Sequence, residues 1–554
     1  MKTIKLFYIL PLALLISFGC EQQVITLEPP PTVENPPPSG GAGTTDLTKF
    51  VAIGNSFVAG MQGQALFNDG QANSLAKIMA TQFAFAGGSA TFNQPDINSV
   101  NGFNPISSNI GAGVILGRLV LFDPDGTTGP RTAAPYPAKF PGAPAVTCPS
   151  AVSATPALPA PYNTSDLPGA YTGNKAALNN FSVPLIYLAQ TLTPATGGPA
   201  SLANPAYSPF YARFASSPSA DGVTGSRIIT DAKAAAGSFY LIWLGFDDVL
   251  LYAATGAANT GPGVPAGTYP MTSSAAFTGQ LAVAMNDPTI GLLTGTTFKA
   301  VIGNIPKFTD LPYFYTVPWN TITLDAATAT TLTGSLAANY NGFLDQMVAN
   351  SIITASERDK RKLTYVAGKN GVLLTDETLT DLSPYMAGPA AALLPYARAR
   401  QATSTDLVPL AAGSILGTCN AGNPQAVFGV SFPVSDQYIL TATETTEILT
   451  RTAEFNTAIS NLVTANSSRL ALADVNKAYS DFVTAKAAVA NGVTITPSFA
   501  PPTGAFSEDG LHPNARGNAF TANIFIDAIN SKFGATIPKA DLSKYVGTGL
   551  PINP

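Results

Sequence analysis

The sequence predicts an α/β fold, a three-layer α/β/α sandwich with a mostly parallel sheet. Two observations support this fold class. Several short apolar runs are nearly continuous rather than alternating, as expected for strands that are covered on both faces. Stretches with a helical pattern lie between these runs, and such alternation is typical of helices packed on both sides of a sheet.

The expected strands and helices are widely spaced along the 554-residue chain. The strands are predicted at residues 48–54, 238–245, 297–306 and 469–475. The main helices are predicted at residues 71–83, 332–352, 442–467 and 515–533.

Two irregular segments interrupt this pattern. Residues 120–235 are dense in Pro, Ala and Gly, and residues 367–432 form a second irregular stretch. Loops of this length are usually functional or form an added subdomain. We therefore expect large insertions in both ranges, the first near one edge of the sheet. The first insertion could cover an active site or bind a partner, and the sequence does not choose between these roles.

The N-terminal segment resembles the signal of a bacterial lipoprotein. Lys2 and Lys5 precede an apolar run from Phe7 to Phe18, and Cys20 follows shortly afterwards. A run of this length suits a signal peptide better than a membrane span. An ordinary secretory signal or an uncleaved anchor is the alternative.

The resemblance implies a division of the chain into three parts. Residues 1–19 would be the signal peptide, and Cys20 would become the lipidated first residue. Residues 20–46 form a Pro-rich tether that cannot build a core, and residues 47–554 form the globular domain. We expect attachment to a membrane through the lipid, at the outer membrane or cell surface of a Gram-negative bacterium, on the periplasmic or extracellular face.

Composition argues against several classes of function. Charged residues make up 11% of the chain, the net charge is −5 and there is no basic stripe, so we expect no nucleic-acid partner. One histidine and three cysteines do not suffice for the usual metal sites, so we predict no metal and no cofactor. A calcium site built only from carboxylates stays open. Pairing of Cys148 with Cys419 also stays open.

The stretch "GNSFVAG" places Ser56 directly after the first predicted strand. Ligands of open α/β sheets bind beyond the carboxyl ends of the strands, so a nucleophile is expected here. Gly54 and Gly60 permit a sharp turn and close packing. A polar residue in a structural turn is the alternative interpretation.

The stretch "DGLHPN" contains the only histidine of the chain, His512. A serine hydroxyl becomes a good nucleophile only when a base takes its proton, and a carboxylate orients and stabilises an imidazole base. Asp509 lies three residues before His512, close enough in a turn to reach the ring. A capping histidine at a loop–helix junction is the alternative.

These two stretches resemble the first and last sequence blocks of the SGNH/GDSL hydrolases, in particular the lipoprotein-type GDSL-like lipases and acylhydrolases. The resemblance implies an SGNH/flavodoxin-like fold with Ser56 as nucleophile, His512 as base and Asp509 as its partner. The serine and histidine are 456 residues apart (512 − 56), so the resemblance also implies large insertions.

The middle blocks of the family are altered in this chain. The best match to the second block is "NFSVPL", where the resemblance assigns an oxyanion donor to the backbone N–H of Leu185. The third block reads "GFDDVL", and Asp247 stands where an asparagine amide is expected. An ionised carboxylate cannot donate a hydrogen bond. The resemblance thus assigns the oxyanion site to the N–H of Ser56 and to Leu185, Asp247 and Asn55.

Asn55 and Asp247 suggest a compensating exchange. The family often has Asp before the serine, where this chain has Asn55, and it has Asn where this chain has Asp247. We hypothesise that the two lie close together, and that Asp247 either anchors the Asn55 amide or is protonated by burial.

Two functions remain open. The first is a serine esterase or lipase that acts on small acyl esters, lipids or acetylated glycans. The alternative is a catalytically impaired surface lipoprotein that binds a glycan, lipid or protein partner.

Overall fold

The computed structural model of the chain describes residues 39–549, apart from residues 101, 110–113, 123–135, 140–168, 202, 259–268, 421, 422 and 424. The predicted signal peptide, the lipidation residue Cys20 and most of the tether lie outside the described residues. Only parts of the predicted insertion at 120–235 are described.

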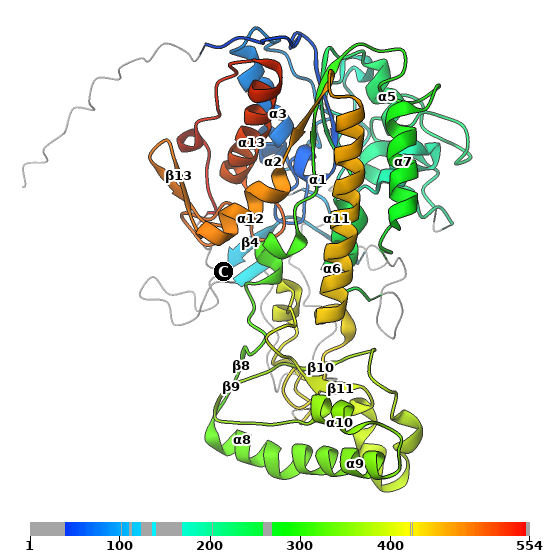
Figure 1. Ribbon diagram of the computed structural model, residues 1–554, viewed down its shortest axis with the longest axis vertical. Coiled ribbons are helices and arrows are strands. Elements are labelled where there is room, and N and C mark those ends of the chain that lie inside the picture. The colour runs from blue at the N-terminus through cyan, green and yellow to red at the C-terminus, as the bar shows by residue number, and fades with distance from the viewer. Residues whose placement is uncertain are drawn as a thin grey trace, which may run out of the picture. The chain divides into compact units, whose positions relative to one another are not determined.

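The fold contains a sheet of four parallel strands, in the order β1–β6–β7–β12. The sheet lies between helices in the upper part of Figure 1. The strands are β1 (Phe50–Gly54), β6 (Phe239–Trp243), β7 (Lys299–Gly303) and β12 (Leu470–Ala473). Every neighbouring pair is parallel, and Gly54 lies beside Trp243 in the register. The α/β class and the four predicted strands are therefore confirmed.

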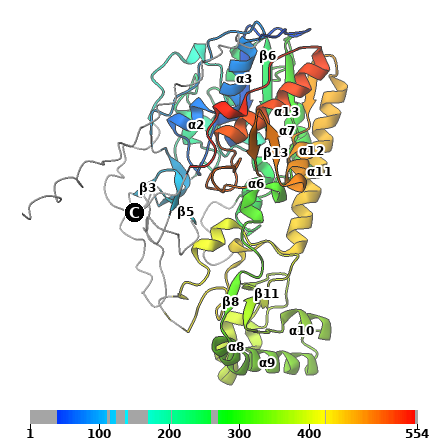
Figure 2. The ribbon, with the colours of Figure 1, turned by 90° about the vertical axis from the view of Figure 1, so that its left-hand side faces the viewer.

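Two groups of helices pack against this sheet. One group contains α3 (Leu75–Ala84) and α13 (Ala515–Phe533), which contact each other, while α13 also contacts β7 and β12. The other contains α6 (Asp247–Ala254), α7 (Ser274–Asn286) and α11 (Ala442–Ala465), and α11 contacts β12 (Figure 2). This arrangement is compatible with a three-layer α/β fold.

Local signals set the ends of the two longest helices. Thr441 accepts a hydrogen bond from the N–H of Glu444, and the Glu444 carboxylate accepts one in return from the N–H of Thr441, which starts α11. Asn514 caps α13 by accepting from the N–H of Gly517. Gly534 ends α13 in the left-handed conformation, at φ 64°. The observed bounds of both helices lie within two residues of those predicted.

Part of the predicted insertion at 120–235 extends the sheet beside β1. Ala52 donates a backbone hydrogen bond to Asn179 and accepts one from Phe181, both at 2.8 Å. The N–H of Val183 donates to the carbonyl of Gly54 at 2.9 Å. This segment therefore runs along β1 to its carboxyl end.

A second hydrophobic cluster spans residues from Ile322 to Ile439 and is separate from the cluster around the sheet. Its helices are α8 (Ala326–Leu332), α9 (Ala338–Ala349) and α10 (Ala355–Arg361). The helix predicted at 332–352 thus packs in this cluster rather than on the sheet. The predicted insertion at 367–432 contributes to the same cluster.

The other α-helices and strands of the described residues complete the chain. They are α1 (Ser56–Ala59), α2 (Asn68–Ala72), α4 (Pro209–Ala212), α5 (Ile228–Ala234), α12 (Val475–Ala485), β2 (Asn104–Asn109), β3 (Val114–Leu116), β4 (Leu119–Phe122), β5 (Tyr136–Lys139), β8 (Ile322–Leu324), β9 (Gly368–Asn370), β10 (Leu373–Thr375), β11 (Ala399–Gln401), β13 (Ala488–Ala490) and β14 (Val493–Ile495).

Within the described ranges, no helix is both long and apolar enough to cross a bilayer. Cys419 is disulfide-bonded. Because Cys20 and Cys148 lie outside the described residues, the pairing of Cys148 with Cys419 stays a prediction.

Candidate active site

Ser56 lies at the first residue of α1, immediately beyond the carboxyl end of β1. Asn55 caps this short helix, with its Oδ1 accepting a hydrogen bond from the N–H of Phe57 at 3.1 Å. A Cβ at Gly54 would lie 2.4 Å from a side-chain atom of Val58, and Gly60 adopts φ +88°. Both glycines are therefore required by the tight turn that carries Ser56.

His512 and Asp509 form a buried pair in the loop before α13. Nδ1 of His512 lies 2.7 Å from Oδ2 of Asp509. Oδ1 of Asp509 accepts the N–H groups of Leu511 and His512 at 2.8 and 2.9 Å, and the hydroxyl of Ser507 at 3.0 Å. The carboxylate thus holds the imidazole in one orientation, as a catalytic base requires.

The pKa of Asp509 is lowered although the residue is fully buried. Burial alone would raise the pKa, but the positive charge that His512 can carry and the hydrogen bonds from His512 and Gln64 outweigh it. Asp509 is therefore ionised at neutral pH.

The two distant sequence blocks meet in the fold. The N–H of Gly63 donates to the hydroxyl of Ser507 at 3.0 Å, and the N–H of Gln64 donates to Oδ2 of Asp509 at 2.8 Å. The ring centroids of Phe57 and His512 are 5.2 Å apart. The segment around Ser56 therefore packs directly against the loop that carries Asp509 and His512.

Leu185 lies where the segment beside β1 reaches the serine. Its N–H donates to Oγ of Ser56 at 2.9 Å. The next N–H along the chain, that of Ile186, donates to Oδ2 of Asp247 at 2.9 Å. Leu185 adopts φ +56°, a left-handed conformation that is unusual for leucine and that aims these successive N–H groups at Ser56 and Asp247.

Asp247 is buried at the start of α6, and its pKa is raised to about 7. Burial is the main cause and Asp248 adds to it, while the N–H of Ile186 and the charge of His512 oppose it. Oδ1 of Asp247 and Nδ2 of Asn55 are both buried without a hydrogen-bond partner. The anchoring of Asn55 by Asp247 that the sequence suggested is therefore not formed.

Three residues near the site were not identified from the sequence. Ser507 supports Asp509, and Asp248 accepts the Leu188 N–H and the Thr272 hydroxyl at 2.9 and 2.7 Å. The hydroxyl of Tyr187 is buried without a partner, and burial raises the pKa of Tyr187 far above its usual value. Asp248 could have been suspected because it follows Asp247, and Ser507 because it lies two residues before Asp509, whereas no sequence signal marked Tyr187.

The site is closed in this structure. Ser56 is 0% exposed and His512 is 2% exposed. Among the hydrogen bonds of the described residues, none joins Ser56 to His512. A substrate can reach the Ser56 hydroxyl only if the residues that cover Ser56 move.

Two of the hollows formed by the described residues lie outside the site. A groove of about 680 Å³ opens at the carboxyl ends of β7 and β12, and its lining includes Asn304, Lys307, Asp310 and Asp474. A smaller hollow of about 310 Å³ lies near the amino end of β1. Neither is lined by Ser56, Asp509 or His512.

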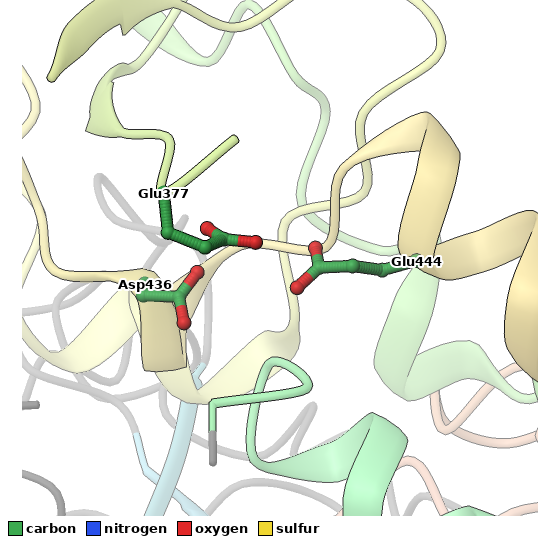
Figure 3. Close-up of side chains that lie close together, drawn as sticks. All are labelled: Glu377, Asp436 and Glu444. Carbon is green, nitrogen blue, oxygen red and sulfur yellow. The ribbon is translucent and has the colours of Figure 1, made fainter. Parts of the chain in front are cut away.

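Three carboxyl groups converge at Glu377, Asp436 and Glu444, as Figure 3 shows. One oxygen from each lies within 4.8 Å of the others, and Glu444 also accepts the N–H and the hydroxyl of Thr441 at 2.7 and 2.8 Å. Burial and Glu377 raise the pKa of Asp436 to about 9, and burial raises the pKa of Glu444 to about 7. At neutral pH, a proton on Asp436 relieves part of the repulsion among the three carboxyl groups. The prediction of no metal stays a prediction.

No family model, curated protein or solved structure matches the chain.

Proposed function

We propose that the protein is a serine ester hydrolase of the SGNH/GDSL type, built on a three-layer α/β/α sandwich with insertions at 120–235 and 367–432. It would be anchored as a lipoprotein through Cys20 at the outer membrane or cell surface. Its substrates would be acyl esters such as small esters, lipids or acetylated glycans. The observation that carries the proposal is the packing of the Ser56 turn against an Asp509–His512 pair.

The proposed reaction has two halves. Oγ of Ser56 attacks the acyl carbon, Nε2 of His512 takes the hydroxyl proton, and the same proton passes to the departing alkoxide. Water, deprotonated by His512, then attacks the acyl-enzyme, releasing the carboxylic acid and restoring the Ser56 hydroxyl. Asp509 stays ionised and stabilises the imidazolium in both halves.

Leu185 suits the role of oxyanion donor in this scheme. At rest its N–H holds Oγ of Ser56 at 2.9 Å. When Oγ bonds to the acyl carbon, the carbonyl oxygen lies one bond from that carbon, within reach of the same N–H. The N–H of Ser56 would be the second backbone donor. Backbone donors fixed before the reaction cost no reorganisation as charge develops.

The alternative, a catalytically impaired lipoprotein that binds a glycan, lipid or protein partner, is favoured by two observations. Ser56 is fully buried, and the largest hollow described above is a polar groove elsewhere on the sheet. Its amide, ammonium and carboxylate groups suit a polar ligand such as a glycan.

Hydrolysis of p-nitrophenyl acetate and butyrate by wild type and Ser56→Ala separates the two functions. We expect turnover by the wild type and a loss of about 10³-fold or more in Ser56→Ala. Ser335→Ala is the matched control, because Ser335 is exposed and lies in the second hydrophobic cluster's helical segment. Equal rates in all three proteins would exclude Ser56 as the nucleophile.

A further inference from the structure

We propose that Asp247 acts as a neutral carboxylic acid that donates a hydrogen bond to the oxyanion formed at Ser56, so that hydrolysis stops when Asp247 ionises. This inference rests on the proposed function. It adds a catalytic residue and a pH limit that the backbone donors alone would not produce.

The position of Asp247 follows from two successive peptide groups. The N–H of Leu185 donates to Oγ of Ser56, and the N–H of Ile186 donates to Oδ2 of Asp247, both at 2.9 Å. Because these N–H groups are neighbours in the chain, the carboxyl group of Asp247 lies beside the serine hydroxyl. The pairing of β1 with β6 supports this placement, since Ser56 and Asp247 follow the carboxyl ends of these strands.

The hydrogen bonds around Asp247 suit a neutral acid. Oδ2 accepts one N–H, whereas Oδ1 is buried with no partner. A buried carboxylate with a single donor is costly, but a proton on Oδ1 removes the charge and turns this oxygen into a donor. Nδ2 of Asn55 is a second buried donor without an acceptor. An oxyanion next to Ser56 would provide the acceptor that both groups lack.

The charged and titratable groups around Asp247 come from four segments. Asp248 is its neighbour on α6 and raises the pKa, and His512 of the C-terminal loop lowers it. Tyr187 follows Ile186 and interacts with both aspartates, while Tyr269 interacts with Tyr187. With burial as the largest cause, the pKa of Asp247 rises to about 7. A bound oxyanion would favour the neutral acid further.

The chemical step needs no extra reactant. The proton stays on Oδ1 of Asp247 while the O–H group donates to the carbonyl oxygen, which gains the electron pair of the broken π bond. When the tetrahedral intermediate collapses, the electron pair returns to the carbonyl and the leaving alkoxide takes the proton held by His512. Asp247 is unchanged at the end of each half-reaction.

The test is the pH dependence of kcat/KM for p-nitrophenyl butyrate between pH 5 and 9.5, with Ser56→Ala as the blank. We expect the wild-type value to fall about ten-fold per pH unit above the pKa of Asp247. Asp247→Asn keeps a donor that does not titrate, so its pH profile should lack this alkaline fall. Asp247→Leu should lose about 10²–10³-fold at pH 6, where the wild type keeps its donor, and should show no alkaline fall of its own.

Asp248→Asn is the matched control, because it removes a neighbouring buried carboxyl whose pKa is also raised to about 7. An amide can still accept the Leu188 N–H and bond to the Thr272 hydroxyl, so we expect this variant to keep the wild-type alkaline fall. An alkaline fall that persists in Asp247→Asn, or that vanishes in Asp248→Asn, would overturn the assignment.

Melting temperatures separate this inference from the proposed function. The folded-state pKa of Asp247 lies above its unfolded value, so its contribution to stability is present at low pH and is lost as pH rises through about 7. The Tm of Asp247→Asn minus the Tm of wild type should therefore increase from pH 5 to pH 8.5. If this gain appears but Ser56→Ala keeps full activity, the proposed function fails and the catalytic role of Asp247 falls with it. If the gain is absent while Ser56→Ala is inactive, only the neutral acid is wrong.

Discussion

The loop at residues 507–512 and the junction between β6 and α6 each place a fully buried aspartate near Ser56, with opposite results. In the loop, Asp509 accepts three N–H groups and a hydroxyl and pairs with His512, and its pKa is lowered. At the junction, Asp247 accepts a single N–H group, and its pKa is raised to about 7.

This difference shows that burial alone does not decide the charge of a carboxyl group. Both side chains lose their water, yet only Asp509 receives several hydrogen bonds, including those from the ring and the N–H of His512, which together offset that loss. We therefore assign the two residues opposite tasks: an ionised Asp509 stabilises the base, and a neutral Asp247 donates a hydrogen bond.

The largest expected effect comes from removing the charge of the loop aspartate. Asp509→Asn can no longer stabilise the imidazolium and favours the wrong tautomer of His512, so kcat/KM should fall by about 10⁴-fold. Ser507→Ala, which removes one of several donors to Asp509, should cost far less. Steady-state kinetics of both variants measure this difference, and similar losses in the two would contradict the assigned role of Asp509.

The comparison also predicts opposite pH dependences of stability. The lowered pKa of Asp509 means that its contribution is present above the unfolded value of 3.8 and is lost as pH falls through the lower folded value. Each unit of such a shift is worth about 1.4 kcal/mol. Chemical denaturation should show that Asp509→Asn loses less stability than wild type between pH 5 and 2. Parallel curves for the two proteins would mean that Asp509 is not strongly stabilised in its ionised form.

The acidic cluster extends the comparison to a smaller effect. Asp436 resembles Asp247 in having a raised pKa, so stability should fall as pH rises toward about 9. Asp436→Asn should melt about 1–2 °C above wild type at pH 9 and close to it at pH 5. Addition of millimolar CaCl₂ should leave the Tm of both proteins unchanged. A calcium-dependent rise in wild type that Asp436→Asn abolishes would show a metal site and contradict the prediction of none.

The smallest effect is expected at Leu185. Leu185→Gly keeps the N–H that faces Ser56 and relieves a left-handed conformation worth about 1 kcal/mol, but it also removes a half-buried side chain. The two changes affect stability in opposite directions. Because the N–H that faces Ser56 is kept, kcat/KM should stay within about three-fold of wild type. A loss of 10²-fold would mean that the side chain, rather than the N–H, serves the reaction.

Elements with a strong local signal could be predicted from the sequence. The four strands are continuous apolar runs, and α13 has a capping Asn514 and a terminal Gly534. The candidate site residues could also be picked out of the sequence, because a single histidine near an aspartate leaves few choices. The proximity of the Ser56 turn and the His512 loop comes from the hydrogen bonds of Gly63 and Gln64 to Ser507 and Asp509, which join segments more than 440 residues apart.

Features that depend on long-range packing could not be predicted. The helical pattern at 332–352 is the same whether it packs on the sheet or in the second cluster. The segment around Asn180 has no strand signal of its own, because it pairs with β1 only through a few backbone bonds. The missing bond between Asn55 and Asp247 depends on side-chain orientations that spacing does not determine.

The most direct test of the central claim is covalent labelling with a fluorophosphonate, followed by mass spectrometry of the digested protein. The account predicts one adduct per chain, on the peptide that contains Ser56. The adduct should be absent in Ser56→Ala and form much more slowly in His512→Ala. A wild-type protein that stays unlabelled, or that carries the label on another serine, would contradict the assignment of a serine hydrolase centred on Ser56.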